Sequence, residues 1–517
     1  MKFFNRENNF NSNISLFLVI VYSFFINIYF ANLGTFPIDT FLHFDSSYRI
    51  LKGEYPVKDY WIVSGFIIDF MQSIFFNLFG LNWYAYIIHS SFMNVIVSVF
   101  TYFFISELIK NKIISLVYTL CFSTLAYTIS GTPFVDHHAT FFLLISTYLI
   151  INFFKFPDRL YLWPIIIFVT FLSFLSKQVP FAYVCLLQGL VIFFFLIKEK
   201  SFKVFLIIFF SILITFIIFY VFLIFLEIDI KLFFTQYFEH PLSIGADRFS
   251  NFNVSLESFF NRYKFLIIPV VLTAYFKFKN GIGKKDHLSF FLILSLGLGL
   301  LYHQILTKNQ IFIYFLIPIF LSILHSEILK TRIKNKSLIN VFLILSIILI
   351  TIKYHNRFNE NRKFHELNKS FLSQSVQANN IDVIFRSLKW VNPFFPRSPA
   401  EEINILKKAK KTLNEKEQNI MLITHYSFFD SITKKNMNYP NRTFTDDGIS
   451  YPMNQKKLQD RYKVFLKSKI KEKSIKEIYF FKHEILSKEI INLNISQNCF
   501  NLKEDDIFFI YEIKCLD

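Results

Sequence analysis

The sequence predicts a polytopic α-helical membrane protein with about eleven spans and a small α/β domain at its C-terminal end. Three observations predict this fold class. Of the 517 residues, 53% are hydrophobic, only 18% are charged, and the mean hydropathy is +0.41, whereas soluble proteins carry about 25% charged residues. Residues 1–353 are mostly long apolar runs separated by short polar breaks. Residues 354–517 are polar with short apolar runs, so we expect a membrane domain (1–353) followed by an extramembrane domain (354–517).

Eleven apolar runs approach or reach the length that a spanning helix needs. A bilayer core requires about 20 apolar residues per helix, with a lower limit of about 17. The predicted spans are 14–31, 84–106, 113–129, 138–154, 161–176, 180–197, 203–226, 265–280, 288–306, 311–328 and 338–353. The first run also fits a cleaved signal peptide. Because it is longer than the 7–15-residue apolar region of such peptides, an uncleaved anchor is expected.

The basic residues orient these spans, since cytoplasmic loops are enriched in Lys and Arg. With the N-terminus inside, the inside segments hold 17 bases, namely Lys2, Arg6, Lys110, Lys112, Lys155, Arg159, Lys198, Lys200, Lys203, Lys277, Lys279, Lys284, Lys285, Lys330, Arg332, Lys334 and Lys336. The longer outside segments hold nine, namely Arg49, Lys52, Lys58, Lys177, Lys231, Arg248, Arg262, Lys264 and Lys308. The net charge of +18 is therefore largely a topology signal and gives no support to nucleic-acid binding. We expect a cytoplasmic (inner) membrane protein with a cytoplasmic N-terminus.

Two of the outside loops are long, 32–83 and 227–264. In the first loop we expect two short helices at the membrane surface. One follows Asp45 and stops at Gly53, and the other runs from Phe66 to Phe79 before Gly80.

The C-terminal residues alternate short apolar runs with amphipathic stretches. Strands are expected at 419–424, 477–481 and 506–513, and helices at 401–413 and 456–473. After an odd number of spans this α/β domain lies outside the cytoplasm. Cys499 and Cys515 both fall in it, so they either form a disulfide, as an oxidising compartment permits, or remain two free thiols.

Acidic residues of the membrane domain gather on the predicted outer face. Eleven of 17 lie there, namely Asp39, Asp45, Glu54, Asp59, Asp69, Asp136, Glu227, Asp229, Glu239, Asp247 and Glu257. Hardly any ionisable group falls within a span, which argues against an ion-coupled transporter. Carboxylates at the outer rim indicate chemistry or metal binding at the membrane surface.

Two acidic segments stand out, 43–61 and 131–138. Asp45 at the start of a surface helix beside lipid is a candidate general base, because partial desolvation raises the pKa of a carboxyl group. Asp136 is a second candidate, and His137 or His138 with Asp136 or Asp45 would suit a divalent metal ion such as zinc or manganese. The alternatives are structural: Asp45 as a helix cap or a partner of Arg49, and the 136–138 segment as the cap of the fourth span.

Candidate ligands of a phosphate are few on the outer face, because bases are scarce there. Lys177 and Gln178 lie at the outer end of the fifth span, and His303 lies beside the short loop after the ninth. A lysine at such a position also commonly extends to the interface without a ligand.

The first outer loop resembles that of the GT-C glycosyltransferases, notably the protein mannosyltransferases and the lipid A aminoarabinose transferases. The resemblance is carried by Asp45, by Leu51-Lys52-Gly53-Glu54-Tyr55-Pro56 with Lys58-Asp59, and by Leu78-Phe79-Gly80. The Asp136 loop, the Lys177-Gln178 element and the C-terminal extracytoplasmic domain are also similar to features of that family.

This resemblance implies a transferase that moves a sugar from a polyprenyl-phosphate carrier to a lipid, glycan or protein acceptor outside the cytoplasmic membrane. It makes Asp45 the leading catalytic residue and Asp136 its support. The substrate-binding candidates are Arg49, Lys58, Asp59, Lys177, Gln178, Arg248 and His303. Aminoarabinose transferases carry a Lys-Pro-Pro segment where this chain has Ile62-Val63-Ser64-Gly65, so Lys58, Lys177 or Arg248 would have to hold the phosphate.

Three other functions are compatible with the same layout. A lipid-linked oligosaccharide ligase or polymerase would use a pyrophosphate donor and typically a basic outer loop, whereas these loops are acid-rich. A transporter or flippase would show charge within its spans and repeats broken by Gly or Pro. A membrane scaffold without catalytic activity is the third alternative.

Overall fold

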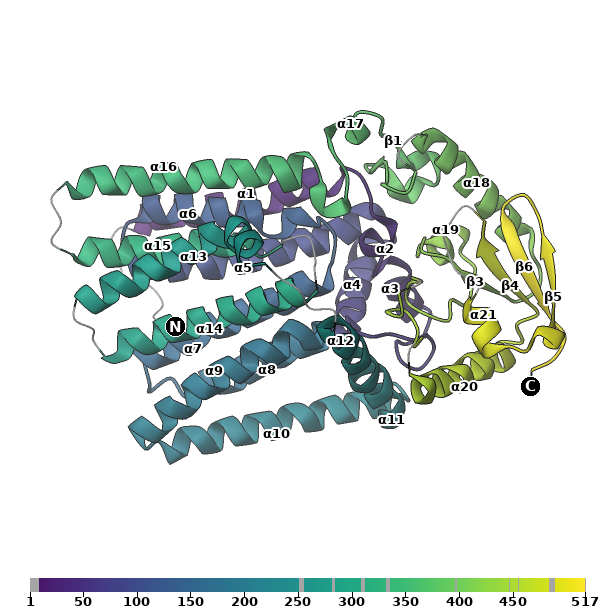
Figure 1. The fold of residues 1–517 in the computed structure, drawn as a ribbon, viewed down its shortest axis with the longest axis horizontal. Coiled ribbons are helices and arrows are strands. Elements are labelled where there is room, and N and C mark those ends of the chain that lie inside the picture. The colour runs from purple at the N-terminus through teal and green to yellow at the C-terminus, as the bar shows by residue number, and fades with distance from the viewer. Residues whose placement is uncertain are drawn as a thin grey trace.

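The computed structural model describes residues 9–250, 255–280, 284–307, 312–331, 335–395, 398–445, 447–453, 455–482 and 489–516. The molecule is elongated, with a bundle of long helices at one end and a mixed α/β region at the other (Figure 1). Five of the bases that orient the predicted spans lie outside the described residues, namely Lys2, Arg6, Lys308, Arg332 and Lys334.

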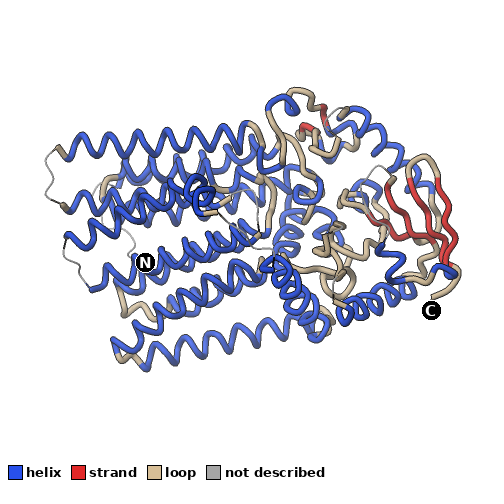
Figure 2. Tube along the Cα trace, in the orientation of Figure 1, coloured by secondary structure: helices blue, strands red, loops and turns tan. Residues whose placement is uncertain are grey.

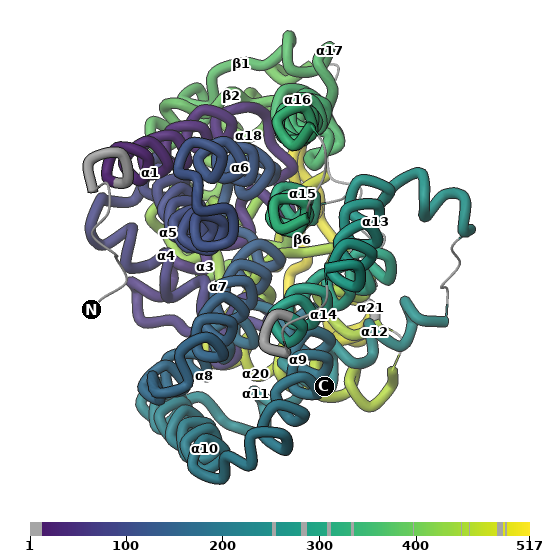
Figure 3. The backbone as a smooth tube through the Cα atoms, turned by 90° about the vertical axis from the view of Figure 1, so that its left-hand side faces the viewer, coloured from purple at the N-terminus to yellow at the C-terminus, as the bar shows by residue number. Residues whose placement is uncertain are grey.

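Within the described residues, a helix occupies each of the eleven predicted spans, which confirms the predicted fold class. These helices are α1 (Asn9–Ala31), α5 (Trp83–Ile109), α6 (Lys112–Leu125), α7 (Val135–Lys155), α8 (Leu162–Ser176), α9 (Gln178–Glu199), α10 (Phe202–Phe225), α13 (Leu256–Lys279), α14 (Lys284–Leu306), α15 (Leu316–Lys330) and α16 (Lys336–His355). Figure 3 shows them end-on, with α7 and α15 near the middle and α10 at the edge.

Nine of the described helical segments are long and apolar enough to cross a membrane. Two of the eleven helices, α8 and α13, are not among these nine segments. Helix α8 has 15 residues, and α13 carries charged side chains near both ends. Side chains of α7 and α15 are buried almost throughout, whereas α10 exposes most of its apolar surface, as expected for a helix that faces lipid.

The first loop between spans forms three short helices at the end of the bundle that faces the α/β region. They are α2 (Pro37–Thr40), α3 (Phe44–Leu51) and α4 (Phe66–Phe79). The bounds of α4 are those predicted. Gly65 precedes α4 with φ +70°, and a Cβ there would lie 2.6 Å from His43 Cε1 and 2.9 Å from an Arg442 nitrogen. Only glycine fits at this close approach.

The second long loop is helical rather than irregular. It consists of α11 (Ile230–Phe234), the π-helical turn η2 (Thr235–Glu239) and α12 (His240–Ser250). In Figure 1 these helices cross the junction between the bundle and the α/β region.

The C-terminal region contains a four-stranded mixed sheet, drawn in red in Figure 2. Its strands are β3 (Ile420–Ile423), β4 (Glu477–Phe481), β5 (Phe500–Glu504) and β6 (Phe508–Ile513), in the order β3-β4-β6-β5. Strands β3 and β4 are parallel, with Ile420 opposite Glu477, and the other pairs are antiparallel. Of the two states left open by the sequence for Cys499 and Cys515, the structure has the disulfide.

Helices cover both faces of this sheet. Along β3, Leu422 packs with α18 (Pro399–Glu415), and Met421 packs with α20 (Lys456–Glu472). Every residue of β3 is buried, because successive side chains of a strand point to opposite faces and both faces are covered.

The C-terminal region shares a hydrophobic core with the first loop. The ring of Phe41 lies 5.7 Å from that of Trp390 and 4.8 Å from that of Phe428. One cluster of buried residues joins both segments to Trp83 at the start of α5. The C-terminal region is therefore packed rigidly on the bundle rather than tethered beside it.

Candidate functional site

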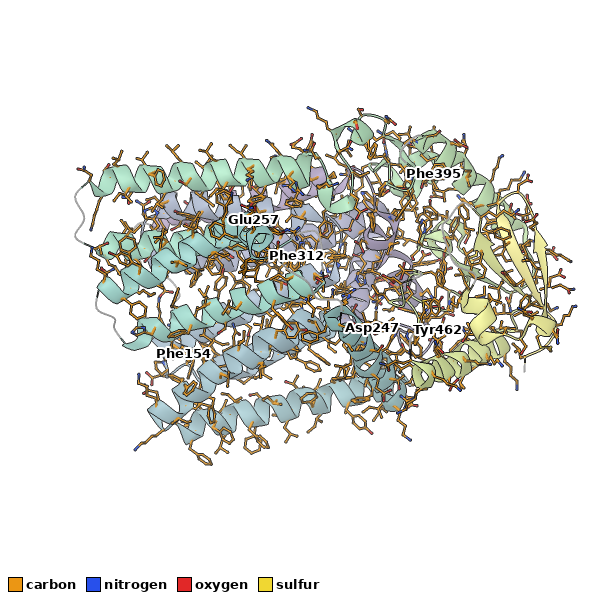
Figure 4. The ribbon with its side chains drawn as sticks, viewed as in Figure 1. Phe154, Asp247, Glu257, Phe312, Phe395 and Tyr462 are labelled. Carbon is orange, nitrogen blue, oxygen red and sulfur yellow. A yellow bond between two sulfur atoms is a disulfide. The ribbon has the colours of Figure 1, made fainter. Side chains whose placement is uncertain are left out.

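A cavity of about 410 Å³ lies at the junction of the bundle and the C-terminal region. Its walls come from the first loop, the ends of α7, α9 and α14, helix α12, and the segment 442–450. Its charged and polar lining residues include Asp39, Asp136, Lys177, Gln178, Arg248, His303 and Arg442. In Figure 4, the labelled Asp247 of α12 and Tyr462 of α20 mark this junction. We call this space the main cavity.

Asp136, Lys177 and His303 form a buried cluster in its wall. Lys177 Nζ donates to Oδ1 and Oδ2 of Asp136, at 2.8 and 2.7 Å, and His303 Nε2 lies 2.7 Å from Asp136 Oδ1. Asp136 is in the first turn of α7, where the helix dipole favours a negative charge. Both carboxylate oxygens therefore have partners, and Asp136 is placed to hold Lys177 in position.

The chain conformation between α8 and α9 brings Lys177 to the cavity. Lys177 is extended, with φ −161° and ψ 129°, and Val179 is again non-helical. Gln178, between them, donates from Nε2 to the carbonyls of Val63 and Tyr237, each at 2.8 Å. These two hydrogen bonds connect the first loop and η2 to the non-helical residues between α8 and α9.

Asp39 presents a carboxylate to the main cavity. It lies in α2, is half-buried, and its side chain has no hydrogen-bond partner among the residues that the structure describes. Burial, followed by the nearby charge of Asp136, raises the pKa of Asp39 to about 7, although Lys177 acts in the opposite direction. A carboxyl group with this pKa and a free oxygen can accept a proton near neutral pH.

Arg442 brings a cation from the C-terminal region to the main cavity. Its Nε and Nη2 donate to Asp69 Oδ2 at 3.1 and 2.6 Å, and its Nη1 donates to the carbonyl of Ser64. Asp69 also accepts from Ser46 and pairs with His43 Nδ1 at 2.6 Å. Burial alone would raise the pKa of Asp69, but Arg442 and His43 hold it below its ordinary value. The guanidinium is thus fixed in orientation against the cavity.

Arg248 on α12 is the third cation of the cavity. It is half-buried and has no carboxylate partner in the described part of the chain. Lys58, by contrast, lies outside the cavity and pairs with Glu227 at 2.6 Å in an exposed position. Of the three predicted phosphate ligands, the structure brings Lys177 and Arg248 together and leaves Lys58 apart.

Asp45 does not line the main cavity. It is 1% exposed, and its carboxylate accepts from the backbone N–H groups of Asp430 and Ser431, at 2.9 and 3.0 Å, at the start of α19 (Phe429–Thr433). Burial raises the pKa of Asp45 to about 6, against these bonds. This geometry does not support Asp45 as the base. It does not cap its own helix or pair with Arg49 either, but joins the first loop to the C-terminal region.

Arg49 and Asp59 also have structural positions. Arg49 Nε donates to Glu54 at 2.8 Å, and its Nη1 donates to the carbonyl of Tyr439 at 3.0 Å. Asp59 accepts from the backbone N–H of Tyr55 at 2.8 Å. Neither residue lines the main cavity, so neither is placed to contact a substrate there.

His137 and His138 point into the protein rather than toward Asp136. His138 Nε2 lies 3.0 Å from His89 Nε2, and the His137 ring packs among Tyr127, Phe134 and Phe312. In the described ranges, no three His, Cys, Asp or Glu side chains are grouped so that they could hold a metal ion. The divalent metal stays a prediction.

Sequence reasoning missed Asp39 and Arg442 as site residues. Asp39 was visible as one of the outer carboxylates, and Pro37 before it signals the helix that presents it. Arg442 had no local signal, because it reaches the cavity only through the packing of the C-terminal region on the first loop.

No protein-family model matches the sequence, and no curated protein matches it. The fold is similar to that of a solved structure, ArnT from Cupriavidus metallidurans, determined with undecaprenyl phosphate bound. The TM-score is 0.50 at 9% sequence identity, and the match covers 96% of this chain and 97% of ArnT. At this identity the similarity concerns the fold, and the chemistry must be argued from the cavity.

Proposed function

We propose that this protein transfers a sugar from a polyprenyl-phosphate carrier to a lipid, glycan or protein acceptor at the main cavity. One observation carries the proposal. The unpartnered carboxylate of Asp39 shares a cavity with three cations, Lys177, Arg248 and Arg442, at one end of a bundle of spans. A free base beside an anion-binding wall is what glycosyl transfer from a lipid phosphate requires.

The donor phosphate would lie between Lys177 and Arg248. Both side chains line the cavity, and Arg248 is free to form a bidentate pair with phosphate oxygens. Apolar lining residues at the ends of spans, Val179, Tyr183 and Leu306, extend the cavity wall toward the bundle. They suit the first isoprene units of the carrier, whose remainder would lie in the membrane.

Asp39 would act as the general base. It removes the proton from the acceptor hydroxyl or amine while the acceptor oxygen or nitrogen forms a bond to the anomeric carbon. The bond from that carbon to the phosphate oxygen breaks, and its electron pair leaves on the polyprenyl phosphate. The cations stabilise the charge that develops on this leaving group. Displacement from the face opposite the phosphate inverts the anomeric configuration.

Asp136 and His303 would position Lys177 rather than react. Both oxygens of Asp136 are occupied, and the pair with Lys177 keeps the ammonium at the cavity wall. The two negative charges of Asp39 and Asp136 are then balanced by the cations until the donor arrives.

The reaction would take place outside the cytoplasmic membrane. The distribution of Lys and Arg supports this orientation. The Cys499–Cys515 disulfide of the C-terminal region also supports it, because disulfides persist in oxidising compartments.

The test uses the purified full-length chain in lipid nanodiscs, supplied in turn with undecaprenyl phosphates that carry different sugars. The wild type should release undecaprenyl phosphate from one of them. Asp39→Asn should lower that rate by about 10²–10⁴-fold, and Asp45→Asn, compared at equal thermal stability, should not. An Asp39→Asn enzyme that turns over normally excludes Asp39 as the base. A wild type that neither binds undecaprenyl phosphate nor consumes any donor excludes the function.

A further inference from the structure

A second cavity, of about 500 Å³, adjoins the main cavity. Its walls are α12, the end of α14 and the segment 447–453. The two cavities share six lining residues, namely Ile244, Arg248, Leu306, Thr307, Asp447 and Ile449. The volume falls within the range of small-molecule sites. Asp39, Asp136, Lys177 and Arg442 do not line it, so it is an adjoining compartment that meets the main cavity along the shared residues, Arg248 among them.

The lining of this second cavity differs in charge from that of the main cavity. Its carboxylates, Asp247 and Asp447, outnumber its one guanidinium, and its hydroxyl groups come from Ser243 and Thr307. An anionic group would meet two like charges here. Carboxylates accept hydrogen bonds from hydroxyl groups, and the apolar side chains of Pro452 and Met453 suit the C–H faces of a sugar ring.

Hydrogen bonds hold the walls of the second cavity in place. Trp61 Nε1 donates to His240 Nδ1 at 3.0 Å, which fixes the tautomer, and His240 Nε2 then donates to the carbonyl of Gly448 at 3.0 Å. Burial lowers the pKa of His240 to about 4, so the ring stays neutral at physiological pH. The segment after Arg442 is thereby attached to α12 at a buried contact.

Asp447 is oriented for a ligand by its own loop. Its Oδ1 accepts from Thr445 Oγ1 at 2.7 Å and from the backbone N–H of Ile449 at 3.1 Å. Its Oδ2 has no partner in the part of the chain that the structure describes, and the residue is exposed at the cavity. This oxygen can accept a hydroxyl hydrogen without any rearrangement.

We propose that the second cavity receives the acceptor, and that the acceptor presents a saccharide hydroxyl rather than a phosphate. This inference rests on the proposed function and names its acceptor class. A donor held at Lys177 and Arg248 closes one side of the main cavity. An acceptor sugar that lies against Asp447 and Ser243 reaches the donor past Arg248, which borders both cavities.

The test obstructs the second cavity without touching the donor site. Ser243 of α12 lines it and is 9% exposed, so Ser243→Phe places a ring in it. Its neighbour Leu242 is 71% exposed and lines neither cavity, so Leu242→Phe is the matched control. Undecaprenyl phosphate binding and the slow release of free sugar to water report the donor site alone. Mass spectrometry of envelope glycans from deletion cells that express each variant reports transfer to the natural acceptor.

The expected result is a separation of the two activities. Ser243→Phe should bind undecaprenyl phosphate and release sugar to water as the wild type does, while transfer to the envelope falls at least about tenfold. Leu242→Phe should restore transfer fully, and the transferred sugar should be attached to a saccharide hydroxyl. Full transfer by Ser243→Phe, or attachment to a phosphate or to a group that is not part of a glycan, overturns the proposal.

A second variant covers the case in which Ser243→Phe does not fold. Met453→Trp places a ring in the second cavity from the segment 447–453, and Met453 does not line the main cavity. It should lower transfer to the envelope while donor binding stays unchanged, and normal transfer by Met453→Trp overturns the proposal. Loss of undecaprenyl phosphate binding by the wild type itself would instead contradict the proposed function.

Discussion

Lys177 Nζ lies 2.8 and 2.7 Å from the two carboxylate oxygens of Asp136. The lysine stands at the interruption between α8 and α9, and the aspartate stands in the first turn of α7. Three spans are therefore joined at the wall of the main cavity by one ion pair, and the ammonium is fixed where a phosphate would approach.

Removal of the Lys177 ammonium should weaken donor binding. In Lys177→Met, Asp136 keeps only His303 as a partner, and the cavity loses one of its cations. We expect the Kd for undecaprenyl phosphate to rise at least about tenfold, since charged hydrogen bonds contribute about 1.5–3 kcal/mol. Lys58→Met removes an exposed pair with Glu227 and is the control. Equal affinities of the two variants, measured by tryptophan fluorescence in nanodiscs, would exclude Lys177 as a phosphate ligand.

The rate of transfer should depend on the protonation of Asp39. Its pKa is raised to about 7, and only the deprotonated form can accept a proton, so activity should be lost as the pH falls through that value. Because Lys177 lowers this pKa, Lys177→Met should move the acid limb to higher pH. Initial rates from about pH 5 to about pH 9 check both statements. A rate that rises toward acid pH would contradict them.

Arg362 should set the positions of Asp39 and Asp136, two of the carboxylates that line the main cavity. It is fully buried, and its guanidinium donates to the carbonyls of Leu33 at 3.1 Å, Thr128 at 2.5 Å and Ser130 at 2.8 Å. Leu33 precedes Asp39, and Ser130 precedes Asp136, each by six residues.

Arg362→Lys keeps the charge but cannot bond all three carbonyls. We expect a loss of at least about 2 kcal/mol of stability and a lower kcat, with the KM for the donor unchanged because Lys177 and Arg248 remain. Arg357→Lys, at an exposed position nearby, is the control. A lower Tm with wild-type kcat would show that Arg362 only stabilises the fold.

The contact between Asp45 and α19 should weaken as the pH rises. Burial, and then the charge of Asp45, raise the pKa of Asp430 well above its ordinary value. The folded state therefore binds more protons than the unfolded state, and stability falls as the pH rises above the ordinary range of Asp. Asp430→Asn removes this dependence, and its amide oxygen can still accept from Met437.

We expect Asp430→Asn to raise the Tm relative to the wild type, by more at pH 8 than at pH 5. Thermal unfolding of the detergent-solubilised chain measures this difference. Asp460→Asn, at an exposed position on α20, should change neither value. A difference in Tm between Asp430→Asn and the wild type that grows toward acid pH would contradict the raised pKa of Asp430.

The helices and much of the sheet follow from local sequence. Apolar runs as long as a bilayer predict the spans, and the strand 477–481 is predicted at its observed bounds because it is apolar on both faces. Strand β5 was missed because Asn501, Lys503 and Glu504 leave it without an apolar pattern.

The site was predicted only in part, because its residues come from segments far apart in the chain. Lys177, His303 and Asp136 lie at ends of helices that the spans predict, Arg248 lies in the predicted outer loop 227–264, and the structure brings all four to one cavity. The choice between Asp39 and Asp45 depends on which of them the C-terminal region covers. The Asp45 carboxylate accepts hydrogen bonds from backbone N–H groups of α19, some 385 residues later in the chain. No local sequence pattern predicts that contact.

The most direct test of the central claim is a structure of this protein with undecaprenyl phosphate bound. The account predicts the phosphate in the main cavity, with oxygens in hydrogen-bond contact with Lys177 and Arg248 and with the Asp39 carboxylate facing the side where the sugar would be attached. A phosphate bound elsewhere, or one that leaves Lys177 and Arg248 without contact, would contradict it.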